Sequence, residues 1–287
     1  MLLFIVGDGY NADDICSGQY LKDMREQMEY LFSCEPYKTY RNYFTVSTAI
    51  AVSPESGIPT FFGSPVDGKT RFNTEAWEGE FQGDDWRVWD YARQYGSGIT
   101  YEREGETTIM VLLNSNLLAA KTYKENNGRS ISYVGKSTDV YPYDQRDYVL
   151  REVGGAGFGK LAPEHISHFT FIRACECGIC NARDEYQKGK ALGWYTNVSL
   201  SGKMSDVPWS HLIFNEKYSK YVDIYEGAYR HARGVWRSED QSVMSTYIPY
   251  YNTISRESIV KRIMQYAGKA YSFEEFVKND KIEIPAL

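Results

Sequence analysis

The stretch Arg151-Glu152-Val153-Gly154-Gly155-Ala156-Gly157-Phe158-Gly159-Lys160-Leu161-Ala162 contains four glycines within six consecutive positions. The pattern around it predicts a helix over about 144–158, in which so many glycines are abnormal. On a regular helix two residues five apart, such as Arg151 and Ala156, point well over a quarter-turn away from each other. The glycines therefore indicate either a distorted helix or one that packs closely on a sheet.

The N-terminal half predicts strands that alternate with helices. Apolar and β-branched runs predict strands at 1–6, 44–52, 107–114 and 130–134. Asn11 can cap a helix whose apolar residues recur at three- and four-residue spacing, namely Leu21, Met24, Met28, Leu31 and Phe32. Residues 56–83 are rich in Gly, Pro and polar side chains and predict a long surface loop. We therefore expect an α/β fold with a mixed sheet.

Two more helices are expected near the C-terminus. Ser255 can open one that stops at Gly268, and Ser272 with Glu275 is a capping-box signature for a short last helix. The sequence contains no internal repeat and no low-complexity linker. A single domain is the simplest partition, with an N-terminal subdomain of about 1–165 and a C-terminal subdomain of about 166–287.

Composition argues against two classes of partner. The net charge of -6 and the pI of about 5.4 provide no basic field for a nucleic-acid backbone. No apolar run approaches the roughly 18 residues expected of a membrane span, and the chain opens on a strand rather than a signal peptide. The aromatic content of 15% is common in proteins that bind peptides or sugars.

The stretch 151–162 resembles the active-site segment of the IgA-peptidase family of bacterial zinc metallopeptidases. In the gut-bacterial branch of that family the matching segment reads His-Glu-x-Gly-Gly-His-Gly-Phe-Gly-Lys-Leu-x-Asp-Glu. The resemblance extends over nearly all of the chain, in Gly7-Asp8-Gly9-Tyr10, Glu35-Pro36-Tyr37, Val52-Ser53-Pro54-Glu55-Ser56-Gly57, Leu113-Asn114-Ser115, Gly234-Val235-Trp236-Arg237 and Ser242-Val243-Met244-Ser245. It implies a zincin or metzincin-like metallopeptidase fold with an active-site helix, and a secreted or cell-surface bacterial protein.

The resemblance also implies a role for each residue of the site. Arg151 and Ala156 fall on the two histidine positions, and Glu152 falls on the general-base position. Pro163 falls on the third ligand position. The residues expected beside the site are Glu164, His165, Met244 in the turn beneath the metal, and Tyr247. Zinc in such a site lowers the pKa of bound water from about 15.7 to roughly 7, so a chain without the ligands is expected to be a pseudoenzyme with an idle Glu152 and no cofactor.

Arg151 has two interpretations. Its guanidinium can replace the charge of the metal by pairing with Glu164 or a nearby carboxylate, or it can turn to solvent. The glycines beside it likewise fit both a distorted backbone and close packing.

Three functions stay open from the sequence. The leading one is a binding module for a polypeptide or glycoprotein, with Tyr247 and Trp236 as cleft residues or as ordinary packing residues. The second is an active zinc endopeptidase in which Glu152 works with an unconventional ligand set. The third is a separate zinc site, because zinc-type ligands crowd into one short region, His165, His168, Cys175, Cys177 and Cys180.

Overall fold

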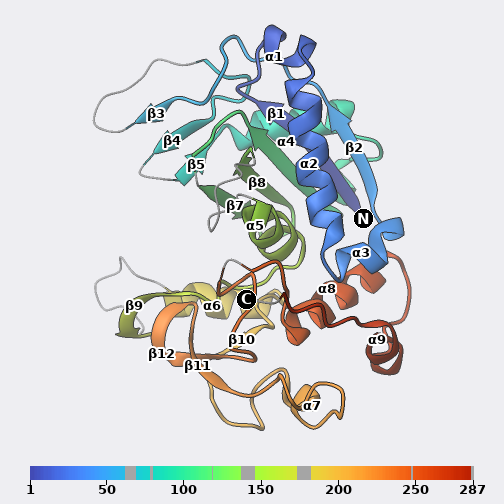
Figure 1. Ribbon diagram of the computed structural model, residues 1–287, viewed down its shortest axis with the longest axis vertical. Coiled ribbons are helices and arrows are strands. Elements are labelled where there is room, and N and C mark those ends of the chain that lie inside the picture. The colour runs from blue at the N-terminus through green and yellow to red at the C-terminus, as the bar shows by residue number, and fades with distance from the viewer. Residues whose placement is uncertain are drawn as a thin grey trace. The chain divides into compact units, whose positions relative to one another are not determined.

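The computed structural model describes residues 1–61, 69–77, 80–117, 119–136, 146–172, 182–246 and 248–285. The chain divides into two compact units, Met1–Phe158 and Gly159–Leu287 (Figure 1). The division falls directly after the glycine-rich helix, whereas the sequence suggested a subdomain boundary near residue 165.

A five-stranded sheet forms the centre of the first unit, in the order β2-β1-β6-β8-β7. Its strands are β1 (Leu2–Asp8), β2 (Thr45–Ala49), β6 (Thr107–Leu113), β7 (Ala120–Lys124) and β8 (Ser130–Gly135). All neighbours are parallel except β7, which runs antiparallel to β8, so the predicted mixed sheet is confirmed. Every residue of β1 and β6 is buried, as expected for strands that are covered on both faces.

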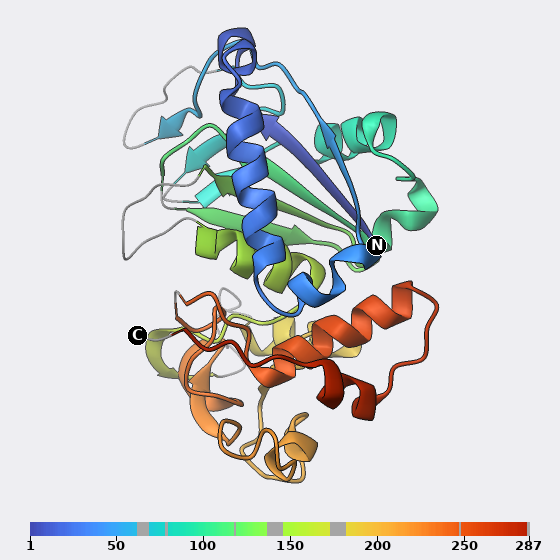
Figure 2. The same cartoon turned by 45° about the vertical axis from the view of Figure 1, so that its right-hand side comes forward.

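Helices surround this sheet. They are α1 (Ala12–Cys16), α2 (Gln19–Ser33), α3 (Tyr37–Tyr40), η1 (Arg41–Tyr43), α4 (Asp85–Tyr95), η2 (Tyr101–Glu106), α5 (Arg146–Tyr148) and η3 (Val149–Phe158). Figure 2 shows α2 across one face of the sheet and α4 behind it. The long segment expected to be a loop also contains a small sheet of β3 (Thr60–Phe61), β4 (Glu75–Trp77) and β5 (Glu80–Gln82).

The first predicted helix is correct at its start and wrong in its continuity. Asn11 forms a capping box with Asp14, which satisfies the free N–H groups of the first turn. The chain then breaks at Gly18, whose φ of 84° is left-handed, so α1 and α2 are separate helices. Within α2, Met24, Leu31 and Phe32 are buried as predicted, whereas Leu21 is 40% exposed.

The second unit contains a four-stranded sheet and four helices in its described residues. The strands are β9 (Ile166–Phe171), β10 (Val198–Ser199), β11 (Tyr225–Ala228) and β12 (Arg230–Arg237). The helices are α6 (Ala182–Ala191), α7 (Ser210–Ile213), α8 (Thr253–Tyr266) and α9 (Phe273–Asn279). Both predicted C-terminal helices are present, but α8 begins before Ser255, the residue predicted to open it. Asn252 caps α8, and Ser272 accepts a hydrogen bond from Glu275 N at the start of α9.

In the described ranges, no helix is long and apolar enough to cross a lipid bilayer.

Candidate functional site

The glycine-rich helix η3 is a π-helix of ten residues. In this geometry the backbone hydrogen bonds join residues five apart, instead of four as in an α-helix. Arg151 and Ala156 therefore lie one turn apart on the same side of η3, although on a regular helix they would diverge. The distortion that the glycines predicted is confirmed. It extends well beyond the single turn in which π-geometry is usually found.

The glycines also allow η3 to approach the sheet closely. A Cβ atom added at Gly157 would lie 3.0 Å from Glu152 O, 3.1 Å from Ser132 Oγ and 3.2 Å from Thr108 Cγ2. The hydroxyls of Thr122 and Ser132 donate to Glu152 O over 3.1 and 3.3 Å. Close packing and backbone distortion, the two alternatives left open by the sequence, thus occur together.

Arg151 and Glu152 form an ion pair on η3. Arg151 Nε lies 3.4 Å from Glu152 Oε1, and the two side chains are only 21% and 13% exposed. The guanidinium also lies 5.7 Å from the centre of the Tyr148 ring. Arg151 therefore does not simply turn to solvent, and the carboxylate at the general-base position has a fixed cation beside it.

The residues that the resemblance places at three zinc-ligand positions do not fit zinc. A guanidinium stays protonated and has no lone pair to donate, the methyl group of Ala156 has no donor atom, and neither has the ring of Pro163. Within the described residues, no group of three or more His, Cys, Asp and Glu side chains is placed to hold a metal ion. The cysteines at 175, 177 and 180 lie outside the described residues, as does the side chain of His168, so the alternative metal site stays a prediction.

In the second unit, the segment 160–165 that follows η3 is tied down by backbone hydrogen bonds. Lys160 O accepts from Tyr195 N over 3.0 Å, and Pro163 O and His165 O each accept over 2.9 Å, from Tyr229 N and Arg230 N. Lys160, Tyr195, Tyr229 and Arg230 all adopt positive φ angles, between 47° and 67°. This conformation is sterically strained for residues other than glycine, and strained residues are found at functional sites more often than elsewhere.

Glu164 is the centre of a buried hydrogen-bond network in the same unit. Its carboxylate, 1% exposed, accepts from Asn197 Nδ2 over 2.8 Å, from Asn252 Nδ2 over 2.9 and 3.0 Å, and from Ser242 Oγ over 2.5 Å. The donors are fixed, because Asn197 Oδ1 accepts from Ala162 N and Asn252 Oδ1 from Ser255 N. These donors satisfy Glu164 within its own unit, so it does not need Arg151 as a partner.

Burial raises the pKa of Glu164 to about 7, while the hydrogen bonds from Ser242, Asn197 and Asn252 act in the opposite direction. The carboxyl group therefore changes its charge near neutral pH.

The turn around Met244 is bound directly to this segment. Met244 is 2% exposed, and its carbonyl accepts from Glu164 N over 2.7 Å and from His165 N over 3.2 Å. Its own N–H donates to Ser242 Oγ over 3.1 Å. Glu164, His165 and Met244 thus contact one another, whereas Tyr247 lies outside the described residues. Trp236 packs over Gly202, at which an added Cβ would lie 2.6 Å from the indole ring.

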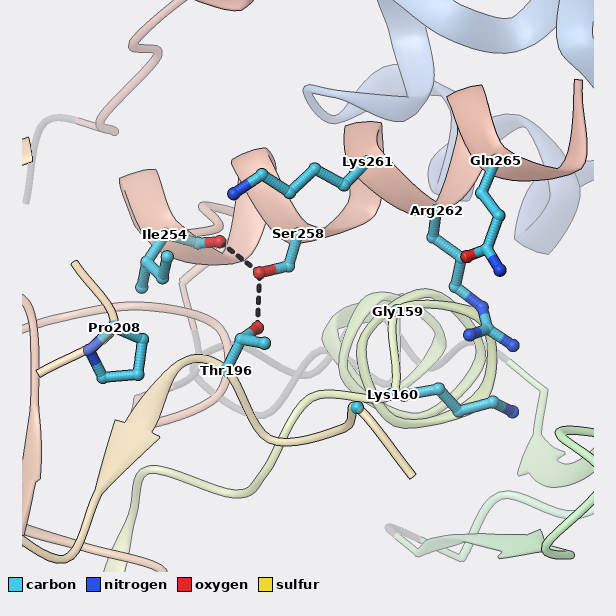
Figure 3. Close-up of a pocket in the computed structure, with 10 residues that line it drawn as sticks. Gly159, Lys160, Thr196, Pro208, Ile254, Ser258, Lys261, Arg262 and Gln265 are labelled. Carbon is cyan, nitrogen blue, oxygen red and sulfur yellow. Dashed lines mark hydrogen bonds between the residues drawn. The ribbon is translucent and has the colours of Figure 1, made fainter. Parts of the chain in front are cut away.

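A pocket of about 190 Å³ lies between the start of this segment and α8 (Figure 3). Ser258 Oγ donates to Ile254 O over 2.7 Å and lies 2.5 Å from Thr196 Oγ1. Lys261 and Arg262 point toward opposite ends of the pocket, and Lys261 Nζ is bound to Glu257 over 2.8 Å. The cations do not converge on one point. Nothing in the sequence pattern indicated this pocket.

Other motifs of the resemblance meet at the carboxyl end of β1 and β6. Asp8 accepts from Ser53 Oγ over 2.8 Å, and Asn114 Nδ2 donates to Gly9 O and Ser56 Oγ over 3.0 and 3.1 Å. All these groups are bound to one another, so this cluster holds loops together.

The comparison with known proteins agrees with the resemblance over the first third of the chain. A sequence model of the family described as IgA Peptidase M64 matches residues 1–97 of the 287. The match spans β1 to α4 in the first unit and ends before η3. No curated protein matches the chain. The fold and this match together support a mixed α/β, peptidase-like unit at the N-terminus.

Proposed function

We propose that this chain is a peptidase-like domain of the IgA-peptidase type that lacks hydrolytic activity and binds a polypeptide or glycoprotein. One observation carries the proposal, namely the donor set on η3 and in the segment after it. Arg151, Ala156 and Pro163 stand where the resemblance requires three zinc ligands, and none of them coordinates zinc.

Glu152 cannot replace the missing ligands. A carboxylate that faces ordinary water, with a guanidinium 3.4 Å away, lacks the activated nucleophile on which metal-dependent peptide hydrolysis depends. The barrier for hydrolysis of a peptide bond is then left nearly unchanged.

Two features support a binding role. The segment 160–165 and the Met244 turn form a rigid scaffold in the second unit, which is what a binding site needs in order to be preorganised. Large apolar side chains are also exposed on both units, with Trp86 71%, Tyr101 70% and Phe169 96% exposed. Exposed aromatic side chains are the usual anchors of polypeptide ligands.

The test combines elemental analysis, a peptidase assay and a binding assay on the whole chain. We expect near-zero zinc, no cleavage of native or denatured proteins, and binding of a fluorescently labelled, reduced and carboxymethylated protein. A Glu152→Gln variant is the matched control, and it should bind this probe as the unaltered chain does.

Stoichiometric zinc together with Glu152-dependent cleavage would overturn the proposal in favour of an active zinc endopeptidase with unconventional ligands. Substitution of Cys177 and of His165 in turn would then locate the metal, in the thiol group or beside the Met244 turn. Absence of zinc, cleavage and probe binding together would also contradict the binding role.

A further inference from the structure

Strand β9 forms an edge of the sheet in the second unit. It pairs in parallel with β12, and in the described part of the chain it pairs with no other strand. Figure 1 shows β9 beside β12 at the margin of that sheet. An edge strand presents a row of N–H and C=O groups to which a further extended chain can be added.

The side chains on this edge are unusually apolar. Phe169 is 96% exposed, Phe171 49% and Ile166 43%. Phe169 and Phe171 lie two positions apart on β9, in the stretch where the register with β12 shifts. Phe171 is held in position, because its ring lies against Gly234, where an added Cβ would be 2.6 Å from Cζ. Two adjacent exposed phenylalanines on an edge strand are a recognised signature of an interaction surface.

Two arginines border the apolar strip. Arg230 is the register partner of Ile166, and Arg233 is the register partner of Phe171. Both side chains are exposed, and neither forms an ion pair with the residues that the structure describes. On the neighbouring strand β11, the carboxylate of Glu226 accepts from Gly234 N over 3.0 Å. The edge therefore combines a backbone row, two aromatic rings and two guanidinium groups.

We propose that the edge formed by β9, with Arg230 and Arg233, binds an acidic, apolar polypeptide segment as an added strand. The inference rests on the proposed polypeptide-binding function and names the chemistry of the partner. Main-chain hydrogen bonds to β9 provide affinity, apolar side chains of the partner contact Phe169 and Phe171, and its carboxylates pair with the two guanidiniums. A basic segment is repelled by the same two arginines.

Fluorescence anisotropy with three labelled nine-residue peptides tests the proposal. One peptide combines Glu with Val and Phe so that each face of the added strand carries both acidic and apolar side chains. The second peptide replaces each Glu by Lys, and the third replaces alternate residues of the first by Pro. We expect the first to bind and the other two to bind at least about tenfold more weakly, because they lose charge complementarity or the strand conformation. Amide hydrogen exchange of residues 166–171 should slow when the first peptide is added.

Two surface variants locate the site. Phe169→Ser/Phe171→Ser and Arg230→Glu/Arg233→Glu should each weaken binding of the first peptide about tenfold or more. Phe214→Ser and Arg25→Glu are the matched controls, because Phe214 is 76% exposed and Arg25 is exposed, and neither lies on β9 or β12. Circular dichroism should show that all four variants are folded.

The outcomes separate this inference from the proposed function. The denatured-protein probe can bind while the acidic peptide does not bind and neither double variant weakens binding of the probe. In that case the assignment of the binding site to the β9 edge is wrong, and the proposed binding function stands. If no probe binds at all, both fail. Concentration-dependent dimerisation that Phe169→Ser/Phe171→Ser abolishes would overturn the inference by assigning the edge to a second copy of the chain.

Discussion

The helix η3 and the segment 160–165 differ in what their side chains provide. In η3 the backbone geometry brings Arg151 and Ala156 to one side, yet their side chains provide no ligand. In the segment 160–165, Glu164 and its hydrogen-bond partners form a complete buried network. The residues that hold the backbone are therefore a different set from those that would perform chemistry. The first set can be intact when the second is missing.

The largest expected effect comes from breaking the network of the second unit. Glu164→Ala should lower the free energy of unfolding by about 4 kcal/mol, because Asn197, Asn252 and Ser242 lose their acceptor in a buried site. Urea unfolding at pH 5, followed by tryptophan fluorescence, measures this loss. Glu164→Gln keeps the side-chain volume and one acceptor oxygen, so its loss of free energy of unfolding should be less than half that of Glu164→Ala. Equal losses in both variants would show that the hydrogen bonds contribute little.

The pH dependence of stability sharpens the same point. The pKa of Glu164 rises on folding from 4.5 to about 7, so the native state binds the proton more tightly than the unfolded chain. The resulting stabilisation is fully present below about pH 4.5 and is lost as the pH rises to about 7, a change of about 3 kcal/mol. Urea midpoints between pH 4.5 and 8 measure it. Glu164→Gln should remove this slope, and an unchanged slope would assign the titration to another group.

The sequence predicted the elements whose signals are local. The apolar run behind β6, the Asn11 cap and the Ser272 cap all depend on residues within a few positions of one another, and each is confirmed. The break at Gly18 was missed because the apolar spacing begins only at Leu21 and is not affected by a break before it. A left-handed glycine interrupts a helix without changing that spacing.

The candidate site was predictable only in part. Glycine content indicated a distortion of η3, but its π-geometry depends on packing against Ser132 and Thr108 of neighbouring strands. The network of Glu164 joins residues 78 and 88 positions away, Ser242 and Asn252, and no local pattern encodes such pairs. Strand β9 was not predicted at all, because three of its six residues, Ser167, His168 and Thr170, are polar and no continuous apolar run marks it.

A smaller effect is expected from the packing of η3. Gly157→Ala places a methyl group 3.0 Å from a backbone oxygen, which cannot turn aside as a side chain can. We expect a loss of about 1 to 2 kcal/mol in the free energy of unfolding. Ala156→Ser, on the same helix with a half-buried side chain, is the control and should lose less. If Gly157→Ala left the free energy of unfolding unchanged, close packing against the sheet would not require a glycine at this position.

The smallest expected effect is that of restoring one histidine. Arg151→His alone should leave both zinc content and peptidase activity at the background of the unaltered chain, because Ala156 still lacks a donor. Zinc titration followed by elemental analysis after dialysis measures the outcome.

The double variant Arg151→His/Ala156→His is the informative partner of that experiment. The π-geometry of η3 places positions 151 and 156 one turn apart, so two imidazoles there can share one ion. Zinc affinity should rise about tenfold or more over the single variant. Peptide hydrolysis should stay absent, because Pro163, which the resemblance implies at the third ligand position, has no donor atom. Zinc binding by the single variant would mean that another side chain already supplies a ligand, and the separation between intact scaffold and missing chemistry would then fail.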